Sequence, residues 1–243
     1  MSTIAPLVSR CLRHDPDVVV IAEFRDNAAG RALRSALTRA GFEHQSGTEG
    51  HRGNGVLLAA TEPFEATRNP FGLSDDDYPN AVMEGRFGTL RLFGVYLPGQ
   101  DRKRPHLRCF IALAQYCNEN GVDALCIGDM NSGRNASDIE LNLRRDDLAD
   151  AFSTADLYEE LERYWTEAWA HLHPDEYEFS WYPFRTDPDF TSRNGWRIDK
   201  AFVSPSLLPR LRSAEYDHFF RLDHLTDHSA LIVDFAAREQ DTT

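Results

Sequence analysis

Short apolar runs alternate along the chain with longer stretches in which apolar residues recur every three or four positions. The short runs, rich in β-branched residues, predict strands at 17–23, 55–59, 89–95, 122–127, 197–203 and 229–235. The periodic stretches 28–40 and 108–120 predict helices, since each is followed by the glycine that commonly ends a helix. A third helix is expected from about 157 to 171. This alternation predicts a layered α/β body.

Two long segments between these elements predict loops. Residues 62–80 and 172–196 are rich in Pro, Asp, Asn and Gly, and loops of that length in a compact domain are usually functional or disordered. The chain has no internal repeat and no linker-like segment, so we expect residues 1–243 to form a single domain.

The composition is that of a globular protein, with 42% of the 243 residues apolar and 27% charged. No apolar run reaches the roughly 18 residues that a membrane-spanning helix needs, and the first residues lack the pattern of a secretory signal. No C-x-x-C pair of the zinc-binding kind occurs among the four cysteines at positions 11, 109, 117 and 126. We therefore expect a cytoplasmic protein with buried, reduced thiols.

The net charge argues against a protein that coats nucleic acid. Subtracting 39 acidic residues from 26 basic residues gives −13, whereas long-range attraction to phosphates needs positive charge. A nuclease remains compatible with this value, because carboxylates of a metal site add negative charge and a bound divalent cation inverts it locally.

Polar side chains stand at the ends of several predicted strands. The chain places Glu23, the Gly-Asp-Met-Asn turn that contains Asp129 and Asn131, Asp199, and the pair Asp227–His228 at such positions. Each feature alone is common at strand ends and turns. Together, carboxylates, an amide and an imidazole from separate strand ends are the ingredients of a site that binds a hard cation and a phosphoryl group.

Seven short motifs, in order, resemble the endonuclease/exonuclease/phosphatase superfamily, and most closely its exodeoxyribonuclease III and abasic-site endonuclease branch. The motifs are DVVVIAE (17–23), GNGVLLAA (53–60), GVYLPG (94–99), CIGDMNS (126–132), FSWYPFR (179–185), NGWRIDKAFVSP (194–205) and TDHSALIVDF (226–235). The resemblance implies a DNase-I-like, four-layer α/β sandwich of two packed mixed β-sheets flanked by helices. It also implies a divalent-metal-dependent phosphodiester hydrolase that uses Mg²⁺ or Mn²⁺, with DNA cleaved at abasic sites or 3′ ends.

The resemblance assigns a role to each matching residue. Glu23 resembles the family's metal-binding glutamate, and Asp227 the acidic residue that serves as a second metal-side ligand. Asp129 resembles the aspartate that holds or deprotonates the attacking water, with Asn131 orienting it. Tyr96 matches a tyrosine near the scissile phosphate.

The same comparison pairs His228 with Asp199, which would orient it. Independently of the resemblance, a histidine that acts on phosphoryl oxygen must be held in one tautomer, and a buried carboxylate does this while favouring the charged ring. Five further residues are expected to contact substrate: Arg102, Trp181, Asn194, Trp196 and Arg197. Trp181 and Trp196 offer aromatic surfaces for a base or sugar, and Arg102 begins a basic run beside the Tyr96 motif.

The chain departs from the family pattern at its start and at Gly99. Family members open with an interior strand that ends in Trp-Asn or similar, whereas residues 4–13 here resemble the helix that follows it. We weigh three explanations: a start upstream of Met1, another strand in the gap, or a degenerate relative. Gly99 stands where relatives that process DNA usually carry Asn.

These departures leave two other functions open. One is a phosphatase or phosphodiesterase for a small phosphorylated substrate or lipid, which the charge of −13 and Gly99 favour. The other is a binding module without catalytic activity. We expect no membrane span, and nothing in the sequence calls for an obligate protein partner.

Overall fold

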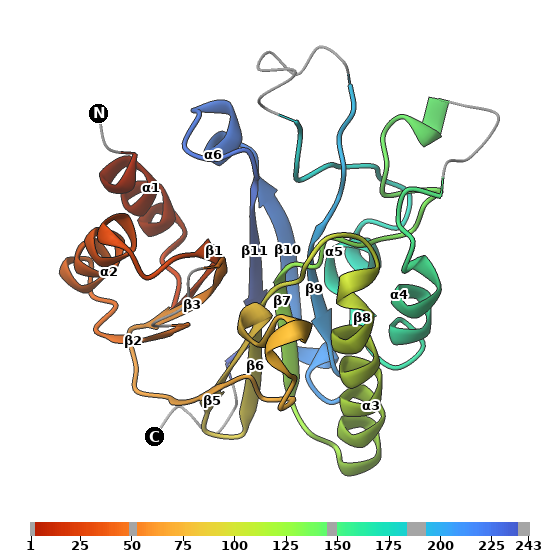
Figure 1. The fold of residues 1–243 in the computed structure, drawn as a ribbon, viewed down its shortest axis with the longest axis horizontal. Coiled ribbons are helices and arrows are strands. Elements are labelled where there is room, and N and C mark those ends of the chain that lie inside the picture. Colours follow the sequence, from red (N-terminus) through yellow and green to blue (C-terminus); the bar gives the residue numbers. More distant parts are fainter. Residues whose placement is uncertain (1–2, 49–52, 145–149, 184–192, 238–243) are drawn as a thin grey trace.

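A six-stranded mixed sheet forms the centre of the protein (Figure 1). The computed structural model describes residues 3–48, 53–144, 150–183 and 193–237. The strands follow the order β4 (Glu65–Arg68), β5 (Val82–Phe87), β6 (Leu90–Tyr96), β7 (Ala124–Asp129), β9 (Asp199–Val203) and β8 (Thr166–Glu167). The β6–β7 pair is parallel and the other pairs are antiparallel. Consequently β6 and β7 end at the same edge of the sheet.

A second layer of strands packs on one face of this sheet, in two parts. One part has the order β1 (Val18–Phe24), β3 (Gly55–Ala60) and β2 (His44–Gly47). The other is the antiparallel pair β10 (Leu211–Asp217) and β11 (Ala230–Phe235). Side chains from both parts share one apolar core with the six-stranded sheet, including Leu58, Leu125 and Ala214.

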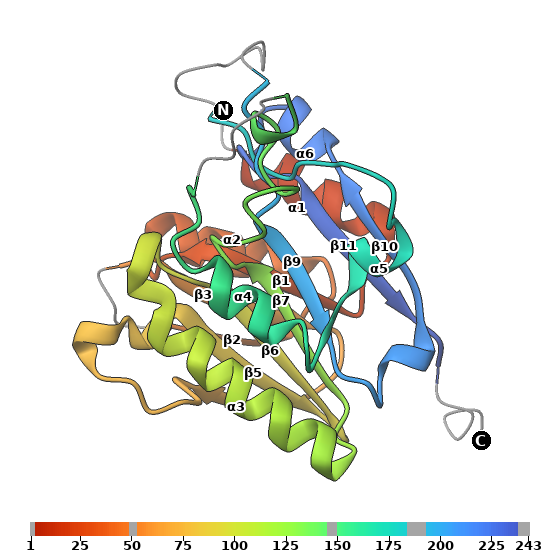
Figure 2. The same cartoon turned by 90° about the vertical axis from the view of Figure 1, so that its right-hand side faces the viewer.

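Helices cover the outer faces of both layers (Figures 1 and 2). α1 (Ile4–Cys11) and α2 (Ala28–Arg39) lie over β1 and β3, where Val8, Leu37 and Leu57 form a small core. α3 (Arg104–Asn120) and α4 (Ala155–Leu161) cover the other face of the six-stranded sheet, with Phe110 and Tyr158 in the core. The result is helix, sheet, sheet, helix, which confirms the four-layer prediction.

Shorter elements complete the fold. α5 (Ala168–Leu172) packs against β9 and β10, and α6 (Phe219–Leu222) links β10 to β11. Single turns of 3-10 helix occupy Leu12–His14, Asp75–Asp77, Pro79–Ala81, Gln100–Lys103, Asn142–Arg144 and Leu208–Arg210. No helix in the described ranges combines the length and apolar character needed to cross a bilayer.

Glycine fixes the backbone where β7 meets its neighbour. Gly128 has a φ of +139°, and a Cβ atom there would lie 2.2 Å from the carbonyl oxygen of Val95 on β6. Only glycine therefore allows β6 and β7 to approach so closely. This close approach positions Asp129, the next residue, beside the end of β6.

The predicted elements match the structure unevenly. All six predicted strands are present, and the helix expected at 108–120 begins earlier, at Arg104. The helix predicted from about 157 to 171 is wrong, because α4 ends at Leu161 and the chain then forms β8 and α5. The loop prediction for 62–80 is wrong in part, since it contains β4, whose residues are all exposed and lack an apolar alternation.

Candidate active site

The predicted catalytic residues meet at one edge of the six-stranded sheet. Tyr96 and Asp129 are register partners in the parallel β6–β7 pair, and Asp129 and Asp199 are partners in the antiparallel β7–β9 pair. His228, two residues before β11, reaches Asp199 from the second layer. The strand register therefore brings Tyr96, Asp129 and Asp199 together. The hydrogen bond between His228 and Asp199 adds the histidine to this group.

Asp129 is held in place by its neighbour Asn131. The main-chain N–H of Asn131 donates to Asp129 Oδ1 at 2.8 Å, and its side-chain amide donates to Asp129 Oδ2 at 3.0 Å and to the carbonyl oxygen of Leu97 at 2.8 Å. Asn131 adopts a left-handed backbone conformation with a φ of +47°. The buried Lys103 ammonium in turn donates to the Asn131 carbonyl oxygen. The carboxylate is thus fixed in one orientation, and sequence reasoning missed the part that Lys103 plays.

The surroundings of Asp129 favour its protonated form. Its relative exposure is only 3%. Burial raises its pKa to about 7, with a further contribution from the negative charge of Asp199, while His228 acts in the opposite direction. A carboxylate whose pKa lies near neutrality can accept a proton from water in this range.

His228 and Asp199 form a tight pair. The distance from His228 Nδ1 to Asp199 Oδ2 is 2.9 Å. Burial alone would lower the pKa of His228, but the charge and hydrogen bond of Asp199, together with the charges of Asp129 and Asp227, raise this pKa to about 10. Because Asp199 holds Nδ1, Nε2 is the ring nitrogen left to contact a ligand.

Glu23 and Tyr96 lie near the carboxylate of Asp129. Glu23 is exposed near the end of β1, where the β1–β3 register shifts, and it has a left-handed φ of +56°. Its carboxylate interacts with the hydroxyl of Tyr96, to which the Asn54 side chain donates at 3.3 Å. Burial raises the pKa of Tyr96 to about 12, so the phenol stays protonated at neutral pH. A non-glycine residue in a left-handed conformation, such as Glu23, often occurs at a functional site.

The two tryptophans extend the site beyond His228, to which Trp181 is joined by an isolated β-bridge. Trp181 Nε1 donates to Asp227 Oδ2 at 3.1 Å, and the Trp181 ring lies 6.5 Å from the His228 ring. Trp196 packs edge-on against Trp181 at 6.1 Å between centroids. Asn194 accepts a hydrogen bond of 3.0 Å from Trp196 Nε1. Both indoles remain partly exposed, so they form a small aromatic surface next to the histidine.

Comparison with known proteins agrees with this arrangement. The model of the Endonuclease/Exonuclease/phosphatase family matches residues 2–228, nearly the whole chain. The chain belongs to this family. No curated protein sequence matches it significantly.

Three solved structures of similar fold come from Neisseria and from Archaeoglobus fulgidus. A 3′-5′ exonuclease, NExo, from Neisseria meningitidis has a TM-score of 0.77 and 21% identity, covering 97% of this chain and 95% of its own. An AP endonuclease from Archaeoglobus fulgidus has a TM-score of 0.76 and 20% identity, with 96% and 94% covered. The NExo D146N 3′ phosphatase from Neisseria, bound to product DNA hairpin, has a TM-score of 0.76 and 21% identity, with the same coverage as the archaeal enzyme. These likenesses establish a shared fold.

Two of the predicted substrate contacts, Arg197 and Arg102, differ in their exposure to solvent. Arg197 is only 3% exposed, and its guanidinium donates to Asp138 Oδ1 at 2.5 Å and to Glu167 Oε2 at 2.7 Å. Its assignment as a substrate contact is therefore wrong, because all of its charge is directed into the core. Arg102 is exposed and donates to the hydroxyl of Tyr78 at 2.8 Å, so it remains accessible to a ligand.

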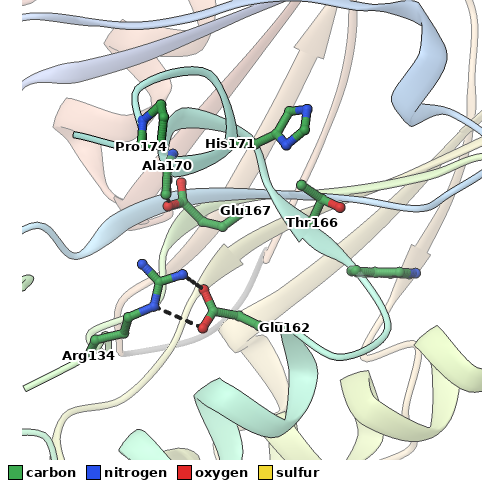
Figure 3. A pocket seen from close by; sticks show the side chains of 8 residues that line it. Arg134, Glu162, Thr166, Glu167, Ala170, His171 and Pro174 are labelled. Atoms are coloured by element: carbon green, nitrogen blue, oxygen red, sulfur yellow. Dashed lines mark hydrogen bonds and ion pairs between the residues drawn. The ribbon is translucent and has the colours of Figure 1, made fainter. Parts of the chain in front are cut away.

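A hollow near these buried charges lies apart from the catalytic residues. It has a volume of about 370 Å³ and is lined by Arg134, Glu162, Trp165, Thr166, Glu167, Ala170, His171 and Pro174 (Figure 3). Its most prominent charges, Arg134 and Glu162, are paired with each other. None of the predicted site residues lines this hollow.

The oxygen donors of the site suit a hard cation. In the part of the chain that the structure describes, no three His, Cys, Asp or Glu side chains cluster as a ready-made metal cage. Mg²⁺ takes only one or two protein carboxylates and completes its shell with water and phosphate oxygens. Glu23 presents an exposed carboxylate, and its charge and that of Asp199 both raise the pKa of Asp129. A divalent cation would offset this excess of negative charge.

Proposed function

We propose that this protein is a divalent-metal-dependent phosphodiester hydrolase that acts on DNA, at abasic sites or 3′ ends. The observation that carries the proposal is the meeting of two hydrogen-bonded pairs, Asp129 with Asn131 and His228 with Asp199, at adjacent strand ends. One pair provides an oriented base and the other a positively charged donor. Phosphodiester hydrolysis needs both groups on the same phosphate.

Each residue of the site has a distinct task in this reaction. Asp129 receives the proton of the attacking water, and Asn131 keeps the carboxylate pointing at that water. His228, charged through Asp199, donates from Nε2 to a non-bridging phosphate oxygen and stabilises the negative charge that develops there. The protonated hydroxyl of Tyr96 offers a second donor at the same edge.

A divalent cation, Mg²⁺ or Mn²⁺, completes the proposed site. Glu23 is the residue best placed to hold it, because its carboxylate is exposed, with Asp129 close by and Asp227 on the His228 side. When bound, the cation neutralises phosphate charge and polarises the phosphorus–oxygen bond. The protein's own part is to orient the water and to hold the proton-carrying groups.

Three observations support DNA as the substrate. The Trp181–Trp196 surface beside His228 can stack on a base or sugar, whatever the sequence. Among the structures of similar fold, one is a 3′ phosphatase bound to a DNA hairpin and another is an AP endonuclease. Arg102, exposed on the turn that follows β6, offers a contact for the phosphate backbone.

A substrate panel tests the proposal. Purified protein is incubated with a duplex that carries one abasic site, with a duplex that has an unmodified recessed 3′ end, and with bis(p-nitrophenyl) phosphate, each in Mg²⁺ and in EDTA. We expect Mg²⁺-dependent cleavage of at least one duplex that weakens as salt rises. Equal rates with and without EDTA, or no hydrolysis of any of the three, would contradict the proposal.

One alternative substrate class has its own support. The net charge of −13 and the small, uncharged Gly99 beside Arg102 favour a small phosphodiester over a long polyanion. For that function the aryl phosphodiester should be cleaved fastest, with little dependence on salt. The same panel therefore separates the two substrate classes.

A further inference from the structure

Lys103 and Lys200 are the only lysines among the 26 basic residues of the chain, and all the others are arginines. Both lysines are buried, with relative exposures of 2% and 0%, although lysine is almost never fully buried in proteins unless it is paired. Lys200 is paired, because its ammonium lies 2.9 Å from the carboxylate of Asp138. In the described part of the chain, the Lys103 ammonium instead contacts a main-chain carbonyl oxygen, that of Asn131.

The position of Lys103 in the fold is unfavourable for a cation. It ends the 3-10 turn Gln100–Lys103 and is the N-cap residue of α3. The start of a helix carries a partial positive charge, which disfavours cations there. Burial lowers the pKa of Lys103 to about 8, while the charges of Asp129 and Asp101 raise this pKa and the charge of Arg102 lowers it. A residue that breaks several local rules at once often belongs to a functional site.

The contact made by Lys103 fixes the conformation of Asn131. Asn131 has a left-handed φ of +47°, a conformation that asparagine adopts more readily than most residues. Its side chain donates to the carbonyl oxygen of Leu97 at 2.8 Å, and its own carbonyl oxygen accepts from Lys103. Leu97 and Lys103 both belong to the segment that leads from β6 to α3. This segment therefore holds the turn after β7 at two points, and that turn carries the two donors that orient Asp129.

The charge of Lys103 also favours the ionised form of Asp129. The carboxylate of Asp129 attracts the ammonium, and this attraction is mutual. Burial raises the pKa of Asp129 to about 7, so the carboxyl group is partly protonated at neutral pH. A cation nearby increases the fraction of Asp129 that can accept a proton. Lysine suits this place because its ammonium is a compact charge, whereas the guanidinium of arginine is a planar fork that fits carboxylates and phosphates.

We propose that Lys103 is a positioning residue of the candidate active site, whose charged ammonium holds Asn131 and, through Asn131, orients the base Asp129 and favours its ionised form. The inference rests on the proposed function, in which Asp129 receives the proton of the attacking water. It assigns Lys103 no contact with the substrate or the reacting phosphate. Hydrolysis then requires the charge of Lys103 and slows at the alkaline pH where this charge is lost.

Steady-state kinetics of Lys103→Met give the first test. Methionine keeps most of the length of the side chain and removes the ammonium. We expect kcat on the fastest substrate of the panel to fall by about 10²-fold, since a small displacement of a catalytic group can cost this much, while KM changes little. Arg108→Met is the matched control, because it removes one exposed positive charge from α3, and it should keep both constants. An unchanged kcat in Lys103→Met, or an equal loss in Arg108→Met, would overturn the proposal.

The pH profile separates positioning from a purely structural role. In the wild type the rate should fall above about pH 8, where Lys103 loses its proton, because a neutral amine is a weaker donor and no longer attracts the carboxylate. The pKa values of His228 and Tyr96 are higher, about 10 and about 12, so these groups titrate later. In Lys103→Met the rate should be low throughout, without the fall near pH 8. The same alkaline midpoint in both proteins would overturn the proposal.

Lysine NMR adds a measurement that does not depend on a folded variant. Because the chain has only two lysines, protein labelled with ¹³C-lysine gives two sets of side-chain signals. We expect one set to titrate near pH 8, at the same midpoint as the fall in the wild-type rate. A fall in rate at a pH where neither lysine titrates would overturn the proposal.

The titration of the Asp129 carboxyl carbon tests the contact without catalysis. Its pKa should be higher in Lys103→Met than in the wild type, because the variant lacks the cation that favours the carboxylate. An equal pKa in the two proteins would overturn the proposal. If the wild type hydrolyses no substrate of the panel, the proposed function fails, and this titration alone then decides whether Lys103 acts on Asp129.

Discussion

The buried charges behind β9 allow a stability prediction with a defined magnitude. The Asp138 carboxylate accepts from Arg197 at 2.5 Å and from Lys200 Nζ at 2.9 Å, and the side chains of Asp138 and Lys200 are fully buried. Glu167 is the other buried carboxylate of this group and binds Arg197 at 2.7 Å. Burial alone would raise the pKa of Asp138, but Lys200 and Arg197 outweigh it and lower that pKa. The aspartate is therefore ionised and compensates two cations.

Replacing Asp138 by Asn keeps the shape of the side chain and removes its charge. Two buried cations would then share the single negative charge of Glu167. Breaking a buried ion pair by removing one partner costs about 3–5 kcal/mol. For a protein of this size, 1 kcal/mol corresponds to about 2–4 °C in Tm, so we expect Asp138→Asn to lower Tm by roughly 6–20 °C.

Differential scanning calorimetry of three variants measures this effect. Asp101→Asn is the matched control, because the Asp101 side chain is 68% exposed and pairs with Arg104 at the surface; its Tm should stay close to that of the wild type. Adding Lys200→Met to Asp138→Asn should recover part of the loss, since one orphaned cation is removed. A Tm change below about 2 °C for Asp138→Asn, on the order of 1 kcal/mol or less, would refute the reasoning.

Three further predictions concern single side chains. Asp217→Asn should lower the free energy of unfolding by about 1–2 kcal/mol at pH 7. Interactions with Arg10 outweigh burial and lower the pKa of Asp217 to about 2, so the cost should shrink as pH falls from about 4 to 2. Urea titrations across this range measure it, and a constant cost would contradict this account. Asp199→Asn should reduce turnover by about 10²–10⁴, because His228 loses its charged partner, and an unchanged kcat would count against that role. Arg102→Ala should weaken DNA binding and make its salt slope shallower by about one unit in a filter-binding titration, and an unchanged slope would remove Arg102 from the phosphate contacts.

The layered fold was predictable because local patterns report burial. The strand runs at 17–23 and 122–127 were found from their β-branched residues, and α3 from its periodicity and its terminal Gly121. The two-residue strand β8 carries no such pattern, so the helical periodicity around it extended the predicted helix wrongly through Glu162–Trp165. Exposed edge strands such as β4 likewise leave no apolar alternation to detect.

The sequence predicted those residues of the candidate site that lie within the family motifs, but it did not predict the residues that support them. Strand register brings Tyr96, Asp129 and Asp199 together, as the motif order implied. Supporting residues such as Lys103 lie far from their partners in sequence, and nothing local distinguishes a lysine that holds Asn131 from one at the surface. The prediction for Arg197 failed for the same reason. Its motif indicated a substrate contact, whereas its ion-pair partner, Asp138, lies 59 positions away and is brought to it only by folding.

Single-turnover hydrolysis by site variants tests the central claim, that acidic and imidazole groups from distant strands act on one phosphodiester. Wild type, Asp129→Asn, His228→Asn and Glu119→Gln are compared in Mg²⁺ on the best substrate of the panel. Glu119 is an exposed residue near the end of α3, remote from the site, and serves as the control. The account predicts that Asp129→Asn and His228→Asn each lose about 10²-fold or more in rate, while Glu119→Gln keeps full activity. Near wild-type rates in either site variant would contradict it.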